Sequence, residues 1–277
     1  MTYGAFQQAF FSKLQTAGIP IEEVRALWAR WTEWKHGNRV AYSLKPPDFP
    51  LPEPEEAQAV VDRLMRHEPW AHIRGQVDFA GLTLSIDPRA LIPRPETEEV
   101  LSLALAVLPA QGRMLDWCSG SGCIALGAKA ARTDSYVEGW EWSADALALA
   151  RQNAEANNLD VPFQRADLNE WPSRGGGLWD VIVSNPPYIH PSEILESSVQ
   201  DYEPHAALYS PREDVLHFYR RLKIWAETQL VPQGYLVLEC HSQHARATSE
   251  LFGAGWRQPE IHVDFCGKER AIRVQRV

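Results

Sequence analysis

The spacing of apolar positions divides the chain into a helical first part and an alternating second part. In the first 72 residues, Val24, Leu27, Trp28 and Trp31 recur at helical spacing. Helices are predicted over FQQAFFSKLQ, EEVRALWARWTEW and AQAVVDRLMRHE, with the proline-rich, acidic connector KPPDFPLPEPEE before the last of them. We interpret the aromatic stripe as internal packing. Residues 1–72 are therefore expected to form a small helical domain.

Strand-like segments begin after this region. GQVDF and LTLSID, separated by Ala-Gly, predict a β-hairpin that links the two parts over residues 73–94. From Pro95 onwards, strands and helices are expected to alternate. The predicted strands are RMLDW, SYVEGWEW, VPFQRAD, LWDVIVS and GYLVLECH. The predicted helices are CIALGAKAAR, SADALALARQNAEANN, EDVLHFYRRLKIWAETQL and HARATSELFGA. This alternation predicts an α/β domain over residues 95–277, with a largely parallel sheet covered by helices on both faces.

Composition and charge narrow the functional classes. The chain has 277 residues, 45% of them hydrophobic, and a formal net charge of −9, which argues against a protein that coats nucleic acid. The first residues, MTYGAFQQAFF, lack a signal-peptide pattern, and the apolar runs are too short for a membrane span. The four cysteines form no C-x-x-C pair, and His241 and His244 have no matching cluster, so no metal site is expected. We expect a cytoplasmic protein with reduced thiols.

Polar residues stand where four successive predicted strands end. Gly120 and Gly122, in LDWCSGSG after the first strand, allow a backbone to approach a ligand closely. Glu141 ends the second strand about 20 residues later, where a carboxylate can bind ribose hydroxyls. Asp167 ends the third strand, where it could meet an adenine, and Asn185 ends the fourth. Taken singly, Glu141 or Asp167 could be a strand-end cap, but four such residues together predict a ligand site at this edge of the sheet.

The glycine-rich loop indicates the kind of ligand. CSGSG is not the dinucleotide pattern G-x-G-x-x-G, and it lacks the lysine of a phosphate-binding P-loop. A nucleoside without phosphates fits better. S-adenosylmethionine is the leading candidate, because its amino acid end can use the amides of the loop and of the helix N-terminus that follows.

The segment SNPPYIH follows the apolar run WDVIV. Its two prolines remove two backbone donors, fix two φ angles and hold the residue before them extended. A simple turn could explain this pattern. Alternatively, the stiff segment holds hydrogen-bond acceptors around a nitrogen atom of a substrate.

Several motifs together carry a family resemblance. LIPRPETEEV (91–100), LDWCSGSGCIAL (115–126) and NPPYI (185–189), in this order, resemble the release-factor glutamine methyltransferases. EPWAHIRGQVDFAGLTLSID (68–87) and YEPHAALYS (202–210) are similar to other segments of that family. The resemblance covers roughly residues 60 to 277. NPPY alone is shared with DNA-adenine and rRNA-guanine methyltransferases, whereas PRPETE combined with NPPY is more discriminating.

The resemblance implies a class I, Rossmann-like methyltransferase with a helical N-terminal substrate-recognition domain. It implies that S-adenosylmethionine is the methyl donor, with S-adenosylhomocysteine as product. The substrate it implies is the side-chain nitrogen of the glutamine in the Gly-Gly-Gln motif of class I peptide-chain release factors. No membrane or direct nucleic-acid partner is expected, and the protein is expected to be a monomer.

The site residues expected on this basis fall into two groups. Cofactor contacts are expected from Thr97, Asp116, Cys118, Ser119, Gly120, Ser121, Gly122, Glu141, Asp167, Leu168 and Asn185. The glutamine is expected to meet Asn185, Pro186, Pro187 and Tyr188. Of these we expect Asn185, Pro186 and Tyr188 to act in catalysis.

The expected chemistry follows from the substrate. An amide nitrogen is a poor nucleophile because its lone pair is delocalised into the carbonyl. The side-chain oxygen of Asn185 and the backbone oxygen of Pro186 could accept its two N–H bonds and favour the tetrahedral nitrogen of the transition state. Tyr188 is expected to pack against the planar amide.

This chain departs from the family pattern at several positions, three of which are among the expected cofactor contacts. Cys118 replaces a usual glycine, so its φ is expected to suit a residue with a side chain. Glu141 replaces a frequent aspartate, and Leu168 replaces a common aromatic residue, which could weaken stacking on adenine.

Three other functions remain open at this point. The NPPY chemistry could act on an exocyclic amine of a DNA or rRNA base, which would have to be flipped or unpaired. The enzyme could methylate glutamine in another protein. The fold could also serve as a non-catalytic binding module.

Overall fold

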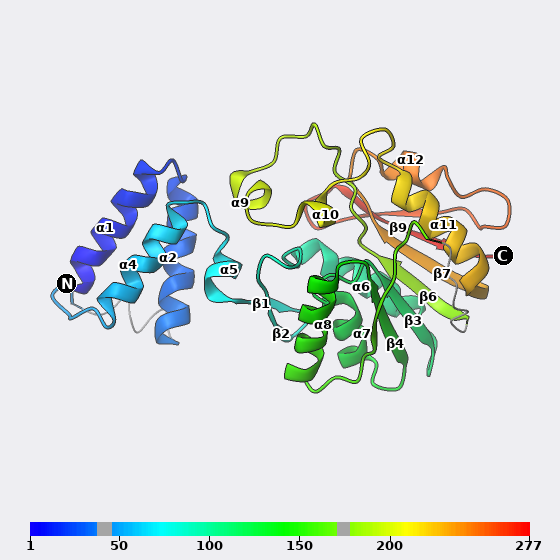
Figure 1. Ribbon diagram of the computed structural model, residues 1–277, viewed down its shortest axis with the longest axis horizontal. Coiled ribbons are helices and arrows are strands. Elements are labelled where there is room, and N and C mark those ends of the chain that lie inside the picture. The colour runs from blue at the N-terminus through cyan, green and yellow to red at the C-terminus, as the bar shows by residue number, and fades with distance from the viewer. Residues whose placement is uncertain (38–45, 171–177) are drawn as a thin grey trace. The chain divides into compact units, whose positions relative to one another are not determined.

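The structure is a computed structural model that describes residues 1–37, 46–170 and 178–277 (Figure 1). Lys45, the first residue of the predicted connector, lies outside the described residues. The chain forms two compact units. The first contains Met1–Gly75 and Glu196–Tyr202, and the second contains Gln76–Leu195 and Glu203–Val277. The helical domain was expected to end at residue 72, and residues 196–202 lie within the range predicted for the α/β domain.

The first unit is helical. It contains α1 (Tyr3–Thr16), α2 (Ile21–His36), α4 (Pro54–Leu64), α5 (Trp70–Arg74) and α9 (Ser197–Gln200). The helices begin and end at suitable residues: the side chain of Thr2 caps α1 by accepting from the Ala5 amide, and Gly37 ends α2 at a φ of 67°. The connector is shorter than predicted, because Pro54 takes the first position of α4, where a missing N–H costs nothing.

Aromatic side chains fill the core of the helical unit. The rings of Trp28 and Trp31 stack with centroids 5.1 Å apart, and Phe6 and Phe10 pack against them. The aromatic stripe seen in the sequence therefore serves internal packing. The separate segment 196–202 joins this unit through Tyr202, whose hydroxyl donates to the carbonyl of Arg66 over 2.8 Å.

The predicted hairpin forms and belongs to the second unit. It consists of β1 (Gln76–Phe79) and β2 (Leu82–Ser85), paired antiparallel. Ala80 and Gly81 both have positive φ, 49° and 77°, as a tight two-residue hairpin turn requires. The side chain of Asn153 fastens β2, because it accepts from the Ser85 amide over 2.7 Å and donates to the Ser85 carbonyl over 3.1 Å.

A seven-stranded sheet forms the second unit, in the order β5-β4-β3-β6-β7-β9-β8. Five strands are parallel: β3 (Arg113–Trp117), β4 (Tyr136–Glu141), β5 (Phe163–Arg165), β6 (Trp179–Ser184) and β7 (Leu230–Glu239). All five were predicted. The antiparallel strands β8 (Glu260–Val263) and β9 (Glu269–Gln275) were not, because charged residues interrupt their apolar positions and hide the run typical of a buried strand.

Helices cover both faces of this sheet, as predicted (Figure 1). One face packs on α6 (Pro95–Val107), α7 (Cys123–Ala131) and α8 (Ala144–Ala156). The other packs on α11 (His217–Gln229) and α12 (Ala245–Ser249), and the short α10 (His205–Leu208) precedes them. Both α11 and α12 are shorter than predicted. In α11 the reason is local: the Asp214 side chain accepts from the Leu216 amide over 3.0 Å and holds residues 214–216 in a turn.

Some features are absent from the described part of the chain. No helix there combines the length and apolar character needed to cross a bilayer. Within the same ranges, no three His, Cys, Asp or Glu side chains gather as a metal site would require. All four cysteines are free thiols, and burial raises the pKa of Cys240 to about 12.

Candidate active site

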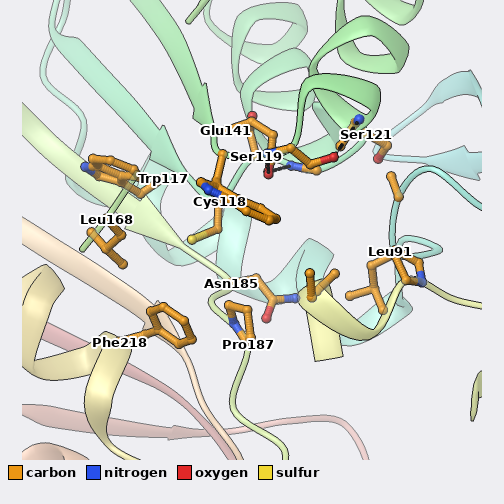
Figure 2. Close-up of a pocket in the computed structure, with 18 of the residues that line it drawn as sticks. Leu91, Trp117, Cys118, Ser119, Ser121, Glu141, Leu168, Asn185, Pro187 and Phe218 are labelled. Atoms are coloured by element: carbon orange, nitrogen blue, oxygen red, sulfur yellow. Dashed lines mark hydrogen bonds between the residues drawn. The ribbon is translucent and has the colours of Figure 1, made fainter. Parts of the chain in front are cut away.

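A cavity of about 470 Å³ opens at the carboxyl ends of the parallel strands, within the size range of small-molecule sites. Residues from the loops after β3, β4, β5 and β6 line it (Figure 2). Ten of the predicted site residues are on the lining: Thr97, Cys118, Ser119, Gly120, Ser121, Glu141, Asp167, Leu168, Asn185 and Pro187. Four are not: Asp116, Gly122, Pro186 and Tyr188. The structure therefore brings the four strand ends together around one space.

The loop after β3 is built from residues with left-handed backbone conformations. Cys118, Gly120 and Gly122 have φ angles of 60°, 54° and 83°. The expectation that Cys118 would adopt a φ suited to a side chain is wrong, because the loop keeps the left-handed conformation that favours glycine, at a cost of about 1–2 kcal/mol. Gly122 serves packing: a Cβ there would lie 2.8 Å from Cζ of Phe163.

Asp116 lies beneath this loop and is fully buried. Its Oδ2 accepts from the Ala125 amide over 3.0 Å, which holds the first turn of α7. Burial raises the pKa of this carboxyl well above its usual value, and the nearby Glu141 adds to the rise. The contacts of Asp116 are thus with the helix that supports the loop.

Glu141 connects two backbone segments at the end of β4. Its Oε2 accepts from the Gly120 amide over 2.8 Å, and its Oε1 accepts from the Ser143 amide over 2.8 Å. Burial raises the pKa of Glu141, and these backbone hydrogen bonds oppose the rise. A carboxylate has about four acceptor positions, so Glu141 can hold the loop and still bind a ligand's hydroxyls.

The loop after β5 places Asp167 and Leu168 on the cavity wall. The Asp167 side chain accepts from the Asn169 amide over 2.8 Å, and Leu168 is buried. Aromatic residues that the sequence analysis missed lie on the same lining: Trp117, Trp142 and Phe218. Trp142 directly follows Glu141, so its position was a usable signal. Phe218 comes from α11, and no local pattern connects it to the site (Figure 2).

The segment after β6 is held on both sides. The Ser184 hydroxyl donates to the Trp117 carbonyl over 2.6 Å, and the Ile189 amide donates to the Leu208 carbonyl over 3.0 Å. Asn185 and Pro187 reach the cavity (Figure 2). Tyr188 is partly buried and is not on the lining, and its hydroxyl donates to Oε1 of Glu239 over 3.3 Å. Burial is the main reason why the pKa of Tyr188 is raised.

The PRPETE segment forms a second wall. Pro95 begins α6, and Thr97, in the first turn, is buried and donates its hydroxyl to Oε2 of Glu239 over 2.7 Å. Glu203, in YEPHAALYS, is also buried; it accepts from the Ile92 amide over 2.9 Å and forms an ion pair with Arg94. Two motifs that are distant in the sequence are therefore joined at the cavity.

The residues of this cavity fit S-adenosylmethionine. Ser119 is buried on the lining, and its hydroxyl has no hydrogen-bond partner among the described residues, so it is free for a ligand. The Glu141 carboxylate suits ribose hydroxyls, and Leu168, Trp117 and Phe218 provide an apolar wall for a base.

Comparison with known proteins agrees with this geometry. The family model "Methyltransferase small domain" matches residues 98–206. The release factor glutamine methyltransferase of Deinococcus radiodurans is 38% identical over 96% of this chain and 95% of its own length. The enzyme of that name from Bacteroides thetaiotaomicron is 36% identical over 80% of this chain and 81% of its own length.

Among solved structures, a methyltransferase from Pyrococcus furiosus matches 80% of this chain and 98% of its own, with a TM-score of 0.53 and 18% identity. This match shows the fold alone. The Rossmann-like methyltransferase fold expected from the sequence is confirmed. Since the curated relatives align over most of both chains at well above 30% identity, the chain belongs to the family of release factor glutamine methyltransferases.

Proposed function

We propose that the protein transfers a methyl group from S-adenosylmethionine to the side-chain amide nitrogen (N5) of the glutamine in the Gly-Gly-Gln motif of class I peptide-chain release factors. The observation that carries this proposal is the meeting of Asn185 with Ser119 and Glu141 around one cavity, in a chain of this family. The residues for a nucleoside cofactor and the residues for an amide thus line one cavity.

The residues on the lining divide between the parts of the cofactor. Glu141 binds the ribose hydroxyls, and Asp167 and Leu168 bind the adenine. The loop residues 118–121 and Thr97 bind the amino acid end, and Gly122 supports the loop by its packing. When bound, S-adenosylmethionine supplies an electrophilic methyl group. The protein contributes orientation and the exclusion of water.

The segment after β6 prepares the substrate nitrogen. The side-chain oxygen of Asn185 and the backbone oxygen of Pro186 accept the two N–H bonds of the glutamine amide. They thereby localise the nitrogen lone pair and aim it at the methyl group, and they stabilise the positive charge that develops on nitrogen. Tyr188, predicted to pack against the amide, is not on the cavity lining in this structure. Its contact with Glu239 makes support of the segment the better role for it.

The proposal extends to the rest of the chain. Residues 1–72 recognise the release factor, residues 73–94 link the parts, and residues 95–277 carry the methyl transfer. The protein works as a cytoplasmic monomer and has no direct nucleic-acid partner.

The test is methyl transfer from labelled S-adenosylmethionine to a purified release factor. A release factor with alanine in place of the Gly-Gly-Gln glutamine is the control. We expect label on the first protein and none on the second. Equal labelling of both, or salt-sensitive labelling of DNA or rRNA in place of the release factor, would contradict the proposal.

A further inference from the structure

A buried carboxylate at the end of β7 joins the two motifs that distinguish this family. Glu239 is 2% exposed. Its Oε2 accepts from the hydroxyl of Thr97, in the PRPETE segment, over 2.7 Å. Its Oε1 accepts from the hydroxyl of Tyr188, in the NPPY segment, over 3.3 Å. Nothing in the sequence analysis selected Glu239, which stands in the apolar run GYLVLECH.

The sheet explains why Glu239 can reach both segments. β6 and β7 are parallel neighbours, and their last paired residues are Ser184 and Leu238. Asn185 and Glu239 are therefore the first residues beyond that pair at the same sheet edge. The other side of Glu239 is also fixed, because its carbonyl accepts from the Tyr219 hydroxyl over 3.2 Å.

A carboxylate is chemically suited to this position. When ionised it only accepts, so one group can take the protons of two hydroxyls at once. Burial raises the pKa of Glu239, whereas the Thr97 hydrogen bond, the Arg270 charge and the Tyr188 hydrogen bond oppose the rise. A glutamine of the same shape keeps one acceptor oxygen and replaces the other by an NH₂ donor. One of the two hydroxyls would then lose its acceptor.

We propose that Glu239 is a positioning residue, which holds Tyr188 and Thr97 so that the Asn185–Pro186 acceptors keep their place beside the cofactor pocket. The inference rests on the proposed function. The two prolines make the segment stiff, so fixing its far end at Tyr188 also fixes Asn185. Glu239 is not itself on the cavity lining and acts through Thr97 and Tyr188.

The main test compares Glu239→Gln with the matched control Glu138→Gln. Glu138 is another buried carboxylate of the same sheet, which accepts from the Tyr136 hydroxyl over 2.9 Å and from Nε1 of Trp140 over 2.6 Å. It does not line the cavity. We expect Glu239→Gln to lower kcat about 10-fold, the scale of losing one charge-assisted hydrogen bond. The KM for the release factor and the Kd for S-adenosylhomocysteine should stay within about 3-fold. Glu138→Gln should leave kcat within about 2-fold.

Two substitutions of Thr97 test the hydrogen bond between Thr97 and Glu239. Thr97→Val removes the donor but keeps the shape, so kcat should fall about as far as in Glu239→Gln, and the double variant should be no worse than either single one. Thr97→Ser keeps the hydroxyl that donates to Glu239, so its kcat at saturating S-adenosylmethionine should exceed that of Thr97→Val. Additive losses in the double variant would overturn the inference.

Amide hydrogen exchange of Tyr188 and Ile189 separates this inference from the proposed function. In Glu239→Gln, exchange there should be at least about 10-fold faster than in the wild type, and unchanged in Glu138→Gln. Unchanged exchange in Glu239→Gln overturns the inference, and so does a kcat as high as that of the control. If the wild type fails to methylate the release factor, the proposed function fails, and the exchange rates then decide the positioning role alone.

Discussion

Two loops that follow neighbouring strands contribute residues to the lining of the same cavity. The loop 118–122 follows β3, and the segment 185–188 follows β6, whose last residue, Ser184, pairs with Trp117. The first loop contains three left-handed residues, so its backbone is compact, and its Ser119 hydroxyl, which has no partner among the described residues, can donate to a ligand. The second contains two prolines, so it is extended and has few donors. Adjacent strand ends thus provide a hydrogen-bond donor on the loop 118–122, here called the donor wall, and acceptors on the segment 185–188, here called the acceptor wall.

The two loops are also supported in parallel ways. A carboxylate at the end of the next strand outwards holds each one. Glu141, on β4, holds the loop after β3 by accepting from a backbone amide. Glu239, on β7, holds the segment after β6 by accepting from the Tyr188 hydroxyl. Pro186 and Pro187 have no amide hydrogen to offer, and Glu239 holds this segment through the side chain of Tyr188. Changes in the acceptor wall should therefore lower turnover, whereas loss of Glu141 beside the donor wall should weaken cofactor binding.

The acceptor wall should be the most sensitive to the loss of a functional group. Asn185→Ala removes one of the two acceptors for the substrate amide and should lower kcat about 100-fold or more, as measured with saturating labelled cofactor and release factor. Asn157→Ala, whose side chain bonds the Thr83 carbonyl away from the cavity, is the control and should keep its kcat. Near-normal turnover in Asn185→Ala would rule out the catalytic role of this wall.

The support of the donor wall should affect binding more than turnover. Glu141→Ala removes the carboxylate expected on the ribose and frees the Gly120 amide, so the Kd for S-adenosylhomocysteine should rise about 10-fold or more. Isothermal titration calorimetry measures this. Asp134→Ala, which loses a similar contact with the Gln111 amide on the surface, should bind normally. An unchanged Kd in Glu141→Ala would limit Glu141 to supporting the loop.

Stiffness of the acceptor wall should matter by a smaller factor. Pro186→Ala keeps the backbone carbonyl but gives the segment more freedom, at a cost of about 0.4–1 kcal/mol. We expect kcat to fall about 2- to 5-fold in the same assay. Pro109→Ala, two residues after the end of α6 and away from the cavity lining, is the control. If Pro186→Ala were as active as that control, the stiffness of the acceptor wall would not contribute to turnover.

In the donor wall, a more flexible backbone should increase stability, because it relieves strain at Cys118. Cys118 has a φ of 60°, so Cys118→Gly should relieve strain that Cys118→Ala retains. We expect the glycine variant to be more stable than the alanine variant by about 1 kcal/mol, or about 2–4 °C in Tm. Thermal unfolding measures the difference. Equal Tm values would mean that the left-handed conformation costs this loop nothing.

The smallest effect should come from Asp116, the buried carboxyl group beneath the donor wall. Burial raises the pKa of Asp116 above its unfolded value, so its contribution to stability is present below the unfolded pKa and is lost as pH rises through the folded one. The Tm of Asp116→Asn relative to the wild type should therefore increase from pH 5 to pH 8. Asp134→Asn is the control. The pKa of Asp134 is lowered by Arg132, so the stabilisation by its charge is lost only at lower pH, and its Tm difference should stay flat. A flat difference for Asp116→Asn would contradict this sign.

The five parallel strands and the longer helices between them, the strand ends that carry Glu141, Asp167 and Asn185, and the family could be predicted from the sequence, whereas β8 and β9 could not. Hydrophobic periodicity is a local property, so it is visible without the fold. The tertiary structure alone decided which distant groups meet. Thr97 and Glu239 are 142 residues apart, and Arg94 and Glu203 are 109 apart. It also decided the conformation of Cys118, because closure of the loop against Glu141 and α7 overrides the preference of a single residue. Pairings of this kind depend on how the sheet aligns its strand ends, and no periodicity along the chain records that alignment.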